Sequence, residues 1–440
     1  MTFDSSQLTP VDDALEYLLR QVSQTQKTEH VMLSNALGRV LAKPQTSQID
    51  VPPWANSAMD GYAVRYSDLA AQTALPVSQR IPAGAVGSAL TPNTAARIFT
   101  GAPMPTGADT VIMQEQCSVD GSHVQLSSSI DGVEKGQNVR AMGEDIRTGQ
   151  QVLAKGQRLR AQELGLLASL GLDSVLVYRK LKIAVLSTGD ELIEPGSAAG
   201  LGQIYNSNRY TLAGLIAGLE MDFVPLGIIA DSRVETERAL QKASQQADII
   251  ISSGGVSVGE EDHVKAVIEG QGFIHLWKLA IKPGKPFAYG EFDGTPVLAL
   301  PGNPSAVLVT FLILARPYLL KMQGMNSIRN TPAVAIADFE MPKPSNRRRY
   351  LHARVQFPQS TDAPIGTTEG FSANQELPNI SQVYGRSLSD HLPKIQLYPQ
   401  QSSGMLSGAS WAQGIAVVEV GQSVTKGQPV LFYSFADLLN

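Results

Sequence analysis

From Lys180 to Gly255 the chain alternates between short apolar runs and longer segments with helical spacing. The runs KIAVLSTG, DFVPLGIIAD and DIIISSGG are typical of buried strands, and RYTLAGLIAGLE and RVETERALQKASQQ are typical of the helices between them. Strands that alternate with helices predict right-handed βαβ units and a parallel sheet. In such sheets ligands bind at the carboxyl ends of the strands, so this pattern also predicts where a site lies.

The length of 440 residues exceeds what one hydrophobic core supports and predicts two to four domains. Apolar periodicity from Thr9 to Leu41 predicts an N-terminal amphipathic helix, and RLRAQELGLLASLGLDSVLV predicts a helix that packs back on it. Gly, Pro and Ser interrupt short β-prone runs between Thr46 and Gly149, and the chain is β-prone again after Asn326. The predicted domains are a discontinuous helical domain (1–45 and 150–178), an inserted β-rich domain (46–149), an α/β domain (179–326) and a C-terminal β-barrel or sandwich (327–440).

Charge and cysteine content exclude several classes of protein. The formal net charge of −5 gives no broad positive field for nucleic acid. Cys117 is the only cysteine, which excludes an intramolecular disulfide framework and fits a reducing cytoplasm. The acidic start lacks the features of a secretory signal. VLVTFLILARPYLL is interrupted by Arg316 and Pro317 and is shorter than the roughly 20 residues of a membrane span, so we expect a buried helix and no membrane association.

Two local signals indicate where helices begin beside the sheet edge. Ser232 and Glu235 form an S-x-x-E capping box directly after the strand that ends at Asp231. Asn303 followed by Pro304 predicts a cap and a first-turn proline at the start of the AVLVTFLILA helix. Asp231 and the loop before Pro304 are therefore expected at the ligand-binding edge.

The loop ISSGGVSVGEED joins a predicted strand to a helix. Gly254 and Gly255 permit close backbone approach, and Ser253 and Ser257 supply hydroxyl groups. Such a loop either cradles phosphate through its N–H groups or is only a tight turn. Asp262, which follows it, either coordinates a cation or caps the next helix.

Carboxylates and lysines converge on the same predicted edge. STGDEL brings Asp190 and Glu191 to the end of one strand, where Asp231 is expected from the next, and such carboxylates can hold Mg²⁺ together with phosphate oxygens. The alternative, less favoured, is that Asp190 only caps the turn. WKLAIKPGKPFAYG carries Lys278, Lys282 and Lys285 between rigid prolines, which favours a fixed anion clamp over a solvated face.

Seven stretches together resemble the molybdopterin molybdenumtransferase family, which includes gephyrin-type members. They are NSAMDGYAVR, FTGAPMPTGAD, NVRAMGEDIR, STGDEL, ISSGGVSVGEED, KLAIKPGKPFAYG and LPGNPSA, in the family's order and across nearly the whole chain. The resemblance implies a discontinuous helical domain, an inserted β lid, a three-layer α/β domain similar to molybdopterin adenylyltransferases, and a C-terminal β-barrel. It also implies a homodimer in which the lid of one subunit faces the α/β domain of the other.

Motifs and resemblance together give the expected site residues. The expected catalytic residues are Asp60, Thr100, Asp145, Glu191 and Asp262. The expected metal ligands are Glu191, Asp231 and Asp262. The expected substrate-binding residues are Ser253, Gly254, Gly255, Ser257, Lys278, Lys282, Pro301, Pro304, His352 and Ser403.

Two positions depart from the family pattern. The chain reads PGNPSAV where relatives commonly read PGNPVSA, which moves the hydroxyl of Ser305 by one residue. His352 stands where relatives commonly carry arginine, with Arg347, Arg348, Arg349 and Arg354 close by in sequence. His352 either contacts the oxyanion, which would make molybdate affinity fall between roughly pH 6 and 8, or points to solvent.

The resemblance implies a cytoplasmic, Mg²⁺-dependent transferase that inserts molybdate into adenylylated molybdopterin and releases AMP. A molybdopterin adenylyltransferase and a non-enzymatic pterin-binding scaffold are the alternatives. Beyond adenylylated molybdopterin and molybdate, the expected partners are an adenylyltransferase and proteins of molybdoenzyme maturation.

Overall fold

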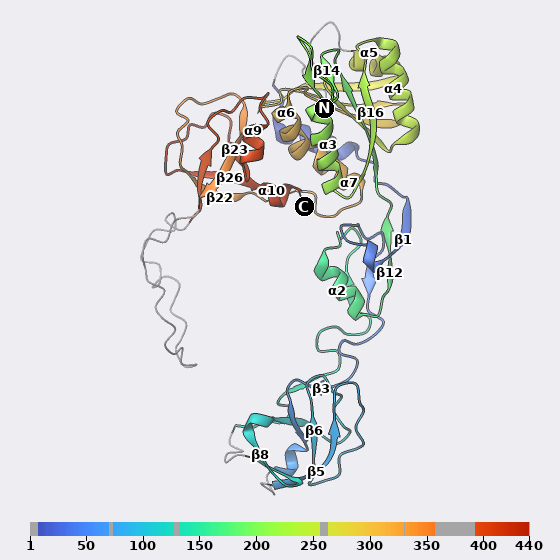
Figure 1. Cartoon of the computed structure of the whole chain (residues 1–440), viewed down its shortest axis with the longest axis vertical. Helices are drawn as coiled ribbons and strands as arrows, with labels where there is room; N and C mark the ends of the chain where they lie inside the picture. Colours follow the sequence, from blue (N-terminus) through green and yellow to red (C-terminus); the bar gives the residue numbers. More distant parts are fainter. Residues whose placement is uncertain are drawn as a thin grey trace. The chain divides into compact units, whose positions relative to one another are not determined.

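The computed structural model describes residues 8–69, 74–126, 132–255, 263–329, 331–356 and 392–439. The chain divides into two compact units (Figure 1). The first comprises Met1–Glu29, Gly38–Val40 and Tyr178–Asn440, and the second comprises His30–Leu37 and Leu41–Val177. The four domain boundaries given above stay a prediction.

A six-stranded sheet forms the centre of the α/β part of the first unit, in the order β16-β13-β17-β21-β20-β18. Strands β16, β13, β17 and β21 run parallel, as predicted. Strands β20 and β18, which lie outside the segment whose spacing predicted a parallel sheet, run antiparallel. The reversal follows from a two-residue turn at Asp293 and Gly294, both with positive φ, which joins β20 directly to β21. The strands are β13 (Lys182–Thr188), β16 (Asp222–Ile229), β17 (Ile249–Ser253), β18 (Gly272–Lys278), β20 (Pro286–Phe292) and β21 (Thr295–Leu300).

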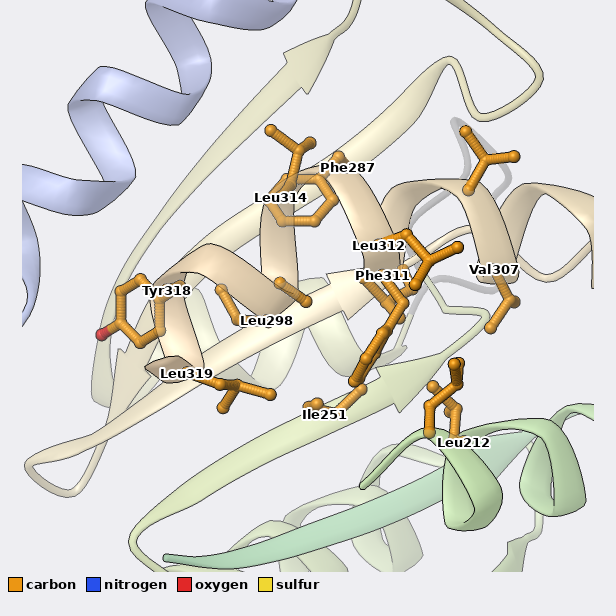
Figure 2. Close-up of a cluster of buried hydrophobic side chains, with 14 of the residues drawn as sticks. Leu212, Ile251, Phe287, Leu298, Val307, Phe311, Leu312, Leu314, Tyr318 and Leu319 are labelled. Atoms are coloured by element: carbon orange, nitrogen blue, oxygen red, sulfur yellow. The ribbon is translucent and has the colours of Figure 1, made fainter. Parts of the chain in front are cut away.

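Helices cover both faces of this sheet and make three layers (Figure 1). Alternate residues of β13 point to opposite faces: Ile183 joins the core beneath α3 and α6, and Ala184 joins the core beneath α4 and α5. Figure 2 shows the first of these cores, where Phe311 and Leu212 pack near Ile251 of the central strand. The helices are α3 (Ser207–Gly218), α4 (Arg233–Gln246), α5 (His263–Gln271) and α6 (Pro304–Thr310). The predicted three-layer α/β class is confirmed.

The apolar segment after Pro304 forms one long helical stretch. It consists of α6, a π-helical turn at Phe311–Ala315 and α7 (Arg316–Met322). Pro317 does not break this helical stretch, because the wider π-turn precedes the residue whose N–H is missing. By length and composition Pro304–Met322 alone among the described helices could cross a membrane, but it is mostly buried in the core, as expected.

The N-terminal helix α1 (Val11–Gln21) belongs to the first unit. Its apolar face, with Val11 and Leu18, joins the core of the α/β sheet. The second predicted helix, α2 (Ala161–Ser169), joins a separate core of the second unit that includes Leu41 and Leu159. The expected packing of these two helices on each other is therefore wrong. Helical periodicity shows which face a helix buries and says nothing about which partner covers it.

The C-terminal part of the first unit is a closed barrel of five strands, in the order β23-β24-β22-β26-β25, closed by pairing of β25 with β23. This settles the choice between barrel and sandwich. A short strand, β19 (Ile281–Lys282), pairs with β23 and attaches the lysine segment to the barrel. The barrel strands are β22 (Ala333–Ala337), β23 (Arg348–Gln356), β24 (Lys394–Leu397), β25 (Gly414–Val418) and β26 (Pro429–Ser434).

The second unit contains a six-stranded sheet in the order β7-β4-β6-β5-β9-β8, which confirms the predicted β-rich character of this region. Three of its strands coincide with the runs AVRYS, ARIFT and TVIMQE. The strands are β4 (Gly61–Val64), β5 (Ala74–Ile81), β6 (Ala95–Ile98), β7 (Thr110–Met113), β8 (Cys117–Asp120) and β9 (His123–Leu126).

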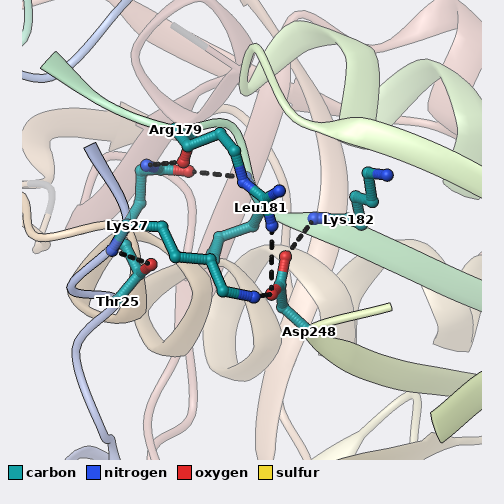
Figure 3. Close-up of polar contacts among 7 residues, drawn as sticks. Thr25, Lys27, Arg179, Leu181, Lys182 and Asp248 are labelled. Atoms are coloured by element: carbon teal, nitrogen blue, oxygen red, sulfur yellow. Dashed lines mark hydrogen bonds and ion pairs between the residues drawn. The ribbon is translucent and has the colours of Figure 1, made fainter. Parts of the chain in front are cut away.

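A polar cluster ties the N-terminal segment to the start of the central sheet. The Asp248 carboxylate pairs with the Lys27 ammonium at 3.0 Å and with the Arg179 guanidinium at 3.7 Å (Figure 3). It also accepts the main-chain N–H of Lys182 at 2.9 Å. The cluster lies at the amino ends of β13 and β17, opposite the edge where ligands bind in such sheets.

Candidate functional site

The carboxyl ends of the parallel strands border a cavity of about 840 Å³. The loops that follow β13, β16, β17 and β21 all contribute to its lining. Of the predicted site residues of the first unit that the structure describes, nine line this cavity and two, Lys278 and His352, do not. The nine are Glu191, Asp231, Ser253, Gly254, Gly255, Lys282, Pro301, Pro304 and, from the barrel, Ser403.

One wall of the cavity is acidic. Glu191, from the loop after β13, and Asp231, from the loop after β16, both line it. The Asp190 carboxylate accepts the main-chain N–H of Asp231 at 3.1 Å and so holds the two loops together. Within the described ranges, no group of three or more His, Cys, Asp or Glu side chains is arranged to hold a metal ion. The third expected ligand, Asp262, lies outside the described residues.

One of the two contacts of the predicted Ser232–Glu235 capping box is present beside this wall. The Ser232 hydroxyl accepts the N–H of Glu235 at 3.3 Å and caps α4. The Glu235 carboxylate pairs instead with Arg238 at 2.6 Å, so the reciprocal contact expected of a capping box is replaced by an ion pair along the helix.

The Gly/Ser loop after β17 forms the floor of the cavity. Gly254 and Gly255 have φ values of +95° and +72°, in the left-handed region that favours glycine. The side-chain NH₂ of Asn208 donates to the Ser253 hydroxyl at 2.8 Å and to the Gly302 carbonyl at 2.6 Å. Asn208 thereby joins two loops of the floor. Ser257 lies outside the described residues.

Another part of the lining is basic. Lys282, Lys285 and Arg347 line the cavity, and the backbone between the lysines is fixed by prolines on either side of Gly284, whose φ is +104°. Lys278 ends strand β18 and is exposed outside the cavity. Of the three lysines of the predicted clamp, Lys282 and Lys285 line the cavity and Lys278 does not; anion binding by them stays a prediction.

The barrel meets the proline loop at this part of the lining. The main-chain N–H of Ser305 donates to the Ser403 carbonyl at 2.9 Å. Pro304 begins α6 as predicted, although the Asn303 side chain makes no capping hydrogen bond. This contact brings Ser403, far away in sequence, to the cavity.

A second, smaller cavity of about 220 Å³ shares Lys282, Pro283 and Gln401 with the large one. Its lining also includes the guanidinium-bearing Arg349 and the buried Ser305. Two cationic side chains and a hydroxyl thus surround a space that suits a small oxyanion.

His352 is buried, with 4% of its surface exposed, so the alternative in which it points to solvent is wrong. Its neighbours on β23, Leu351 and Ala353, belong to the barrel core, so the His352 side chain lies on the opposite face of the strand. It lines neither cavity. Its main-chain N–H donates to Gln401, whose amide donates back to the His352 carbonyl, each at 3.0 Å. Burial lowers the pKa of His352. Its contact with an oxyanion stays a prediction.

The remaining predicted residues belong to the second unit. The Asp60 carboxylate accepts the N–H and the hydroxyl of Thr100, both at 2.8 Å. These two bonds, the main-chain bond first, hold the pKa of Asp60 below its ordinary value. Asp145 is exposed, and its main-chain N–H donates to the Val51 carbonyl at 3.0 Å.

Sequence reasoning missed several residues of the cavity. Asn206 caps α3 by accepting the N–H of Arg209 at 3.3 Å, and Asn208 joins the floor loops. The signal was present, because asparagine directly before a helical segment is a preferred cap. Gln401, which lines both cavities, follows no recognisable motif.

Three family models of molybdopterin biosynthesis proteins match consecutive regions of the chain. Residues 9–171 match the family model "MoeA N-terminal region (domain I and II)", residues 184–321 match "Probable molybdopterin binding domain", and residues 383–435 match "MoeA C-terminal region (domain IV)". The crystal structure of the molybdopterin biosynthesis moeA protein from Pyrococcus horikoshii is similar with a TM-score of 0.77 and 26% identity, covering 98% of this chain and 100% of that one.

Curated relatives agree with these matches. The chain is 43% identical over 339 residues to the molybdopterin molybdenumtransferase of Haemophilus influenzae, which covers 77% of this chain and 83% of the relative. It is 32% identical to the molybdopterin molybdenumtransferase of Synechococcus elongatus, over 95% of this chain and 97% of the relative. The family models, the sequence identities and the shared fold together establish that this chain belongs to the molybdopterin molybdenumtransferase family.

Proposed function

We propose that this chain inserts molybdate into adenylylated molybdopterin and releases AMP, giving the molybdenum cofactor. Family membership supports this reaction. The observation that carries it is the pair of cavities that share Lys282, one large enough for an extended anionic substrate and one of about 220 Å³ beside it. The adenylylated pterin and molybdate, which must react with each other, can thus bind in neighbouring cavities that share the cationic side chain of Lys282.

The large cavity suits the adenylylated pterin. Lys282, Lys285 and Arg347 line this cavity and offset the charge of a pyrophosphate. Repulsion between two close unit charges is about 4 kcal/mol at an effective dielectric near 20, so charge stabilisation is the main contribution expected of these side chains. In the floor loop Gly255 offers its main-chain N–H to the same anion, whereas the N–H of Gly254 already donates to the Leu300 carbonyl at 3.1 Å.

The small cavity suits molybdate. Lys282 and Arg349 supply positive charge, and Ser305 supplies a hydroxyl from a position one residue away from that of relatives. A cationic pocket next to the pterin site keeps the oxyanion near its acceptor before the pyrophosphate link is broken.

The acidic wall fits a divalent cation. Glu191 and Asp231 offer two carboxylates to one cavity, and Mg²⁺ typically takes one or two carboxylates together with phosphate oxygens and water. Bound there, Mg²⁺ would neutralise charge on the pyrophosphate. Asp190 acts on this wall as a positioning residue, because its carboxylate already accepts the N–H of Asp231.

We also propose that the active form is a cytoplasmic homodimer in which Asp60, Thr100 and Asp145 of one copy act on substrate bound to the α/β domain of the other. The support is that Asp60 and Thr100 form a hydrogen-bonded pair in the second unit, whereas the two cavities belong to the first.

Single-turnover release of AMP from adenylylated molybdopterin tests the reaction. Release that requires molybdate supports the proposal. Formation of adenylylated molybdopterin from ATP would instead indicate an adenylyltransferase, and binding without any AMP release would indicate a scaffold.

A further inference from the structure

Exposed apolar side chains form a rim at one side of the large cavity. Strands β14 (Leu192–Ile193) and β15 (Ile204–Tyr205) pair there in parallel, with Leu192 opposite Ile204. Leu192, Ile204 and Tyr205 line the cavity, yet Ile204 is 57% exposed and Tyr205 is 47% exposed. The rest of the lining is mainly polar or charged. The apolar rim is therefore suited to an apolar or aromatic part of the ligand, which the polar lining does not bind well.

The Tyr205 ring is held in place before any ligand binds. Its hydroxyl donates to the Ser197 carbonyl at 2.9 Å. The neighbouring main chain is fixed on both sides, because the N–H of Ile204 donates to the Glu191 carbonyl at 2.8 Å and the N–H of Asn206 donates to the Ile193 carbonyl at 2.9 Å. A ring that is already ordered loses little conformational freedom when a ligand covers it.

We propose that Tyr205 is a stacking platform for a planar heteroaromatic ring of the bound substrate, with Leu192 and Ile204 flanking it. The inference rests on the proposed function, because adenylylated molybdopterin carries an adenine and a pterin on either side of its pyrophosphate. Lysine and arginine side chains hold the charged middle of such a molecule through ion pairs and hydrogen bonds, and its rings need a flat apolar face to cover them. An aromatic face recognises any planar base by stacking and excludes water from it.

Calorimetric titration of the full chain tests the platform with three probes. AMP presents an adenine, neopterin presents a pterin, and ribose 5-phosphate presents a phosphate without a ring. Tyr205→Ala is expected to weaken binding of at least one ring-bearing probe about tenfold and to leave ribose 5-phosphate unchanged. Tyr205→Phe keeps the ring and loses only the hydroxyl bond to Ser197, so its affinity is expected to fall much less than that of Tyr205→Ala.

Tyr210 provides the matched control. It is 55% exposed on the first turns of α3 and does not line the cavity. Tyr210→Ala removes a similar exposed ring from the same region, and all three affinities are expected to stay as in the parent chain.

The outcomes separate the two rings and the two proposals. Weaker binding of AMP assigns the platform to adenine, and weaker binding of neopterin assigns it to pterin. Equal losses for ribose 5-phosphate, unchanged affinities for both ring probes, or no binding of either by the parent chain would overturn the platform. Tyr205→Ala could also change the oligomeric mass measured by light scattering while leaving the affinities for AMP and neopterin unchanged. That result would overturn the platform and assign the rim to a protein interface. Ring-dependent binding in a chain that releases no AMP would leave the platform standing and contradict the proposed function.

Discussion

The Asp60 carboxylate accepts both the main-chain N–H and the hydroxyl of Thr100 on a single oxygen, each at 2.8 Å. This pair holds the pKa of Asp60 below its ordinary value and keeps the carboxylate ionised at neutral pH. Because the folded-state pKa is depressed, the associated stability is present above the unfolded pKa and is lost as pH falls through the folded value.

We predict that Thr100→Val raises the pKa of Asp60, because it removes the hydroxyl donor and leaves only the main-chain donor. Thr100→Ser keeps both donors and is expected to leave the pKa near that of the parent chain. Carbon-13 NMR titration of the Asp60 carboxyl measures the shift directly. Superimposable titration curves for Thr100→Val and the parent would show that the hydroxyl bond does not form in solution.

We predict that Lys282→Ala weakens binding of molybdate and of pyrophosphate at least about tenfold, as loss of one hydrogen bond to a charged group does. Lys282 lines both cavities, whereas Lys278 lines neither, so Lys278→Ala is the matched control and is expected to change affinity little. Calorimetry and thermal unfolding on both variants give the comparison. Equal losses in the two variants would indicate a general charge effect rather than a clamp.

We predict that Glu191→Gln raises the Mg²⁺ concentration needed for half-maximal AMP release by about tenfold or more, because a neutral amide is a poorer ligand for Mg²⁺. Asp190→Asn keeps an oxygen that accepts the N–H of Asp231 and is expected to have a smaller effect. Removal of divalent cations with a chelator is expected to stop turnover in the parent chain. Full turnover after chelation would contradict a role for the cation.

We predict that an Asp60→Asn chain and a Lys282→Ala chain, each nearly inactive alone, recover about a quarter of parental turnover when they are mixed and allowed to exchange subunits. A mixed dimer contains one site with both residues intact only if each site combines groups from two copies. Turnover that stays at the level of the separate variants after proven exchange would place all the groups of one site in a single copy.

We predict that stability falls as pH is lowered from 7 to 5 partly through His352. Burial lowers the pKa of His352 in the folded chain, so between that value and about 6.5 the unfolded chain binds the extra proton and acidification favours unfolding. His352→Met removes the titrating group and is expected to flatten the slope of the unfolding midpoint against pH. His352→Arg is expected to destabilise the barrel at every pH, because it buries a charge.

The sequence predicted those parts of the fold that depend on local periodicity. β13, β17 and α4 lie where the apolar spacing indicated, and the rule that strand ends converge correctly brought Glu191 and Asp231 to one cavity. Lys278 and Lys282 could not be told apart, because Lys278 ends a strand of the α/β sheet and Lys282 pairs with a strand of the barrel. Which sheet each joins depends on partners distant in sequence.

The periodicity of the sequence could not predict which residues the barrel contributes to the site. Gln401 holds the backbone of His352 from a loop that has no characteristic pattern, and Ser403 reaches the cavity through its contact with Ser305. Such contacts form when the barrel packs against the α/β layers, and the spacing of apolar residues along the sequence does not indicate them. Only the family resemblance pointed to Ser403.

The placement of α1 in the first unit has a consequence for synthesis on the ribosome. The residues that bury Val11 and Leu18 belong to the α/β core, which is translated only after the whole of the second unit has emerged. The apolar face of α1 therefore has no partner to pack on until these later residues have been made. The core also includes Ile415 and Leu438, so it is complete only when nearly the whole first unit has been translated.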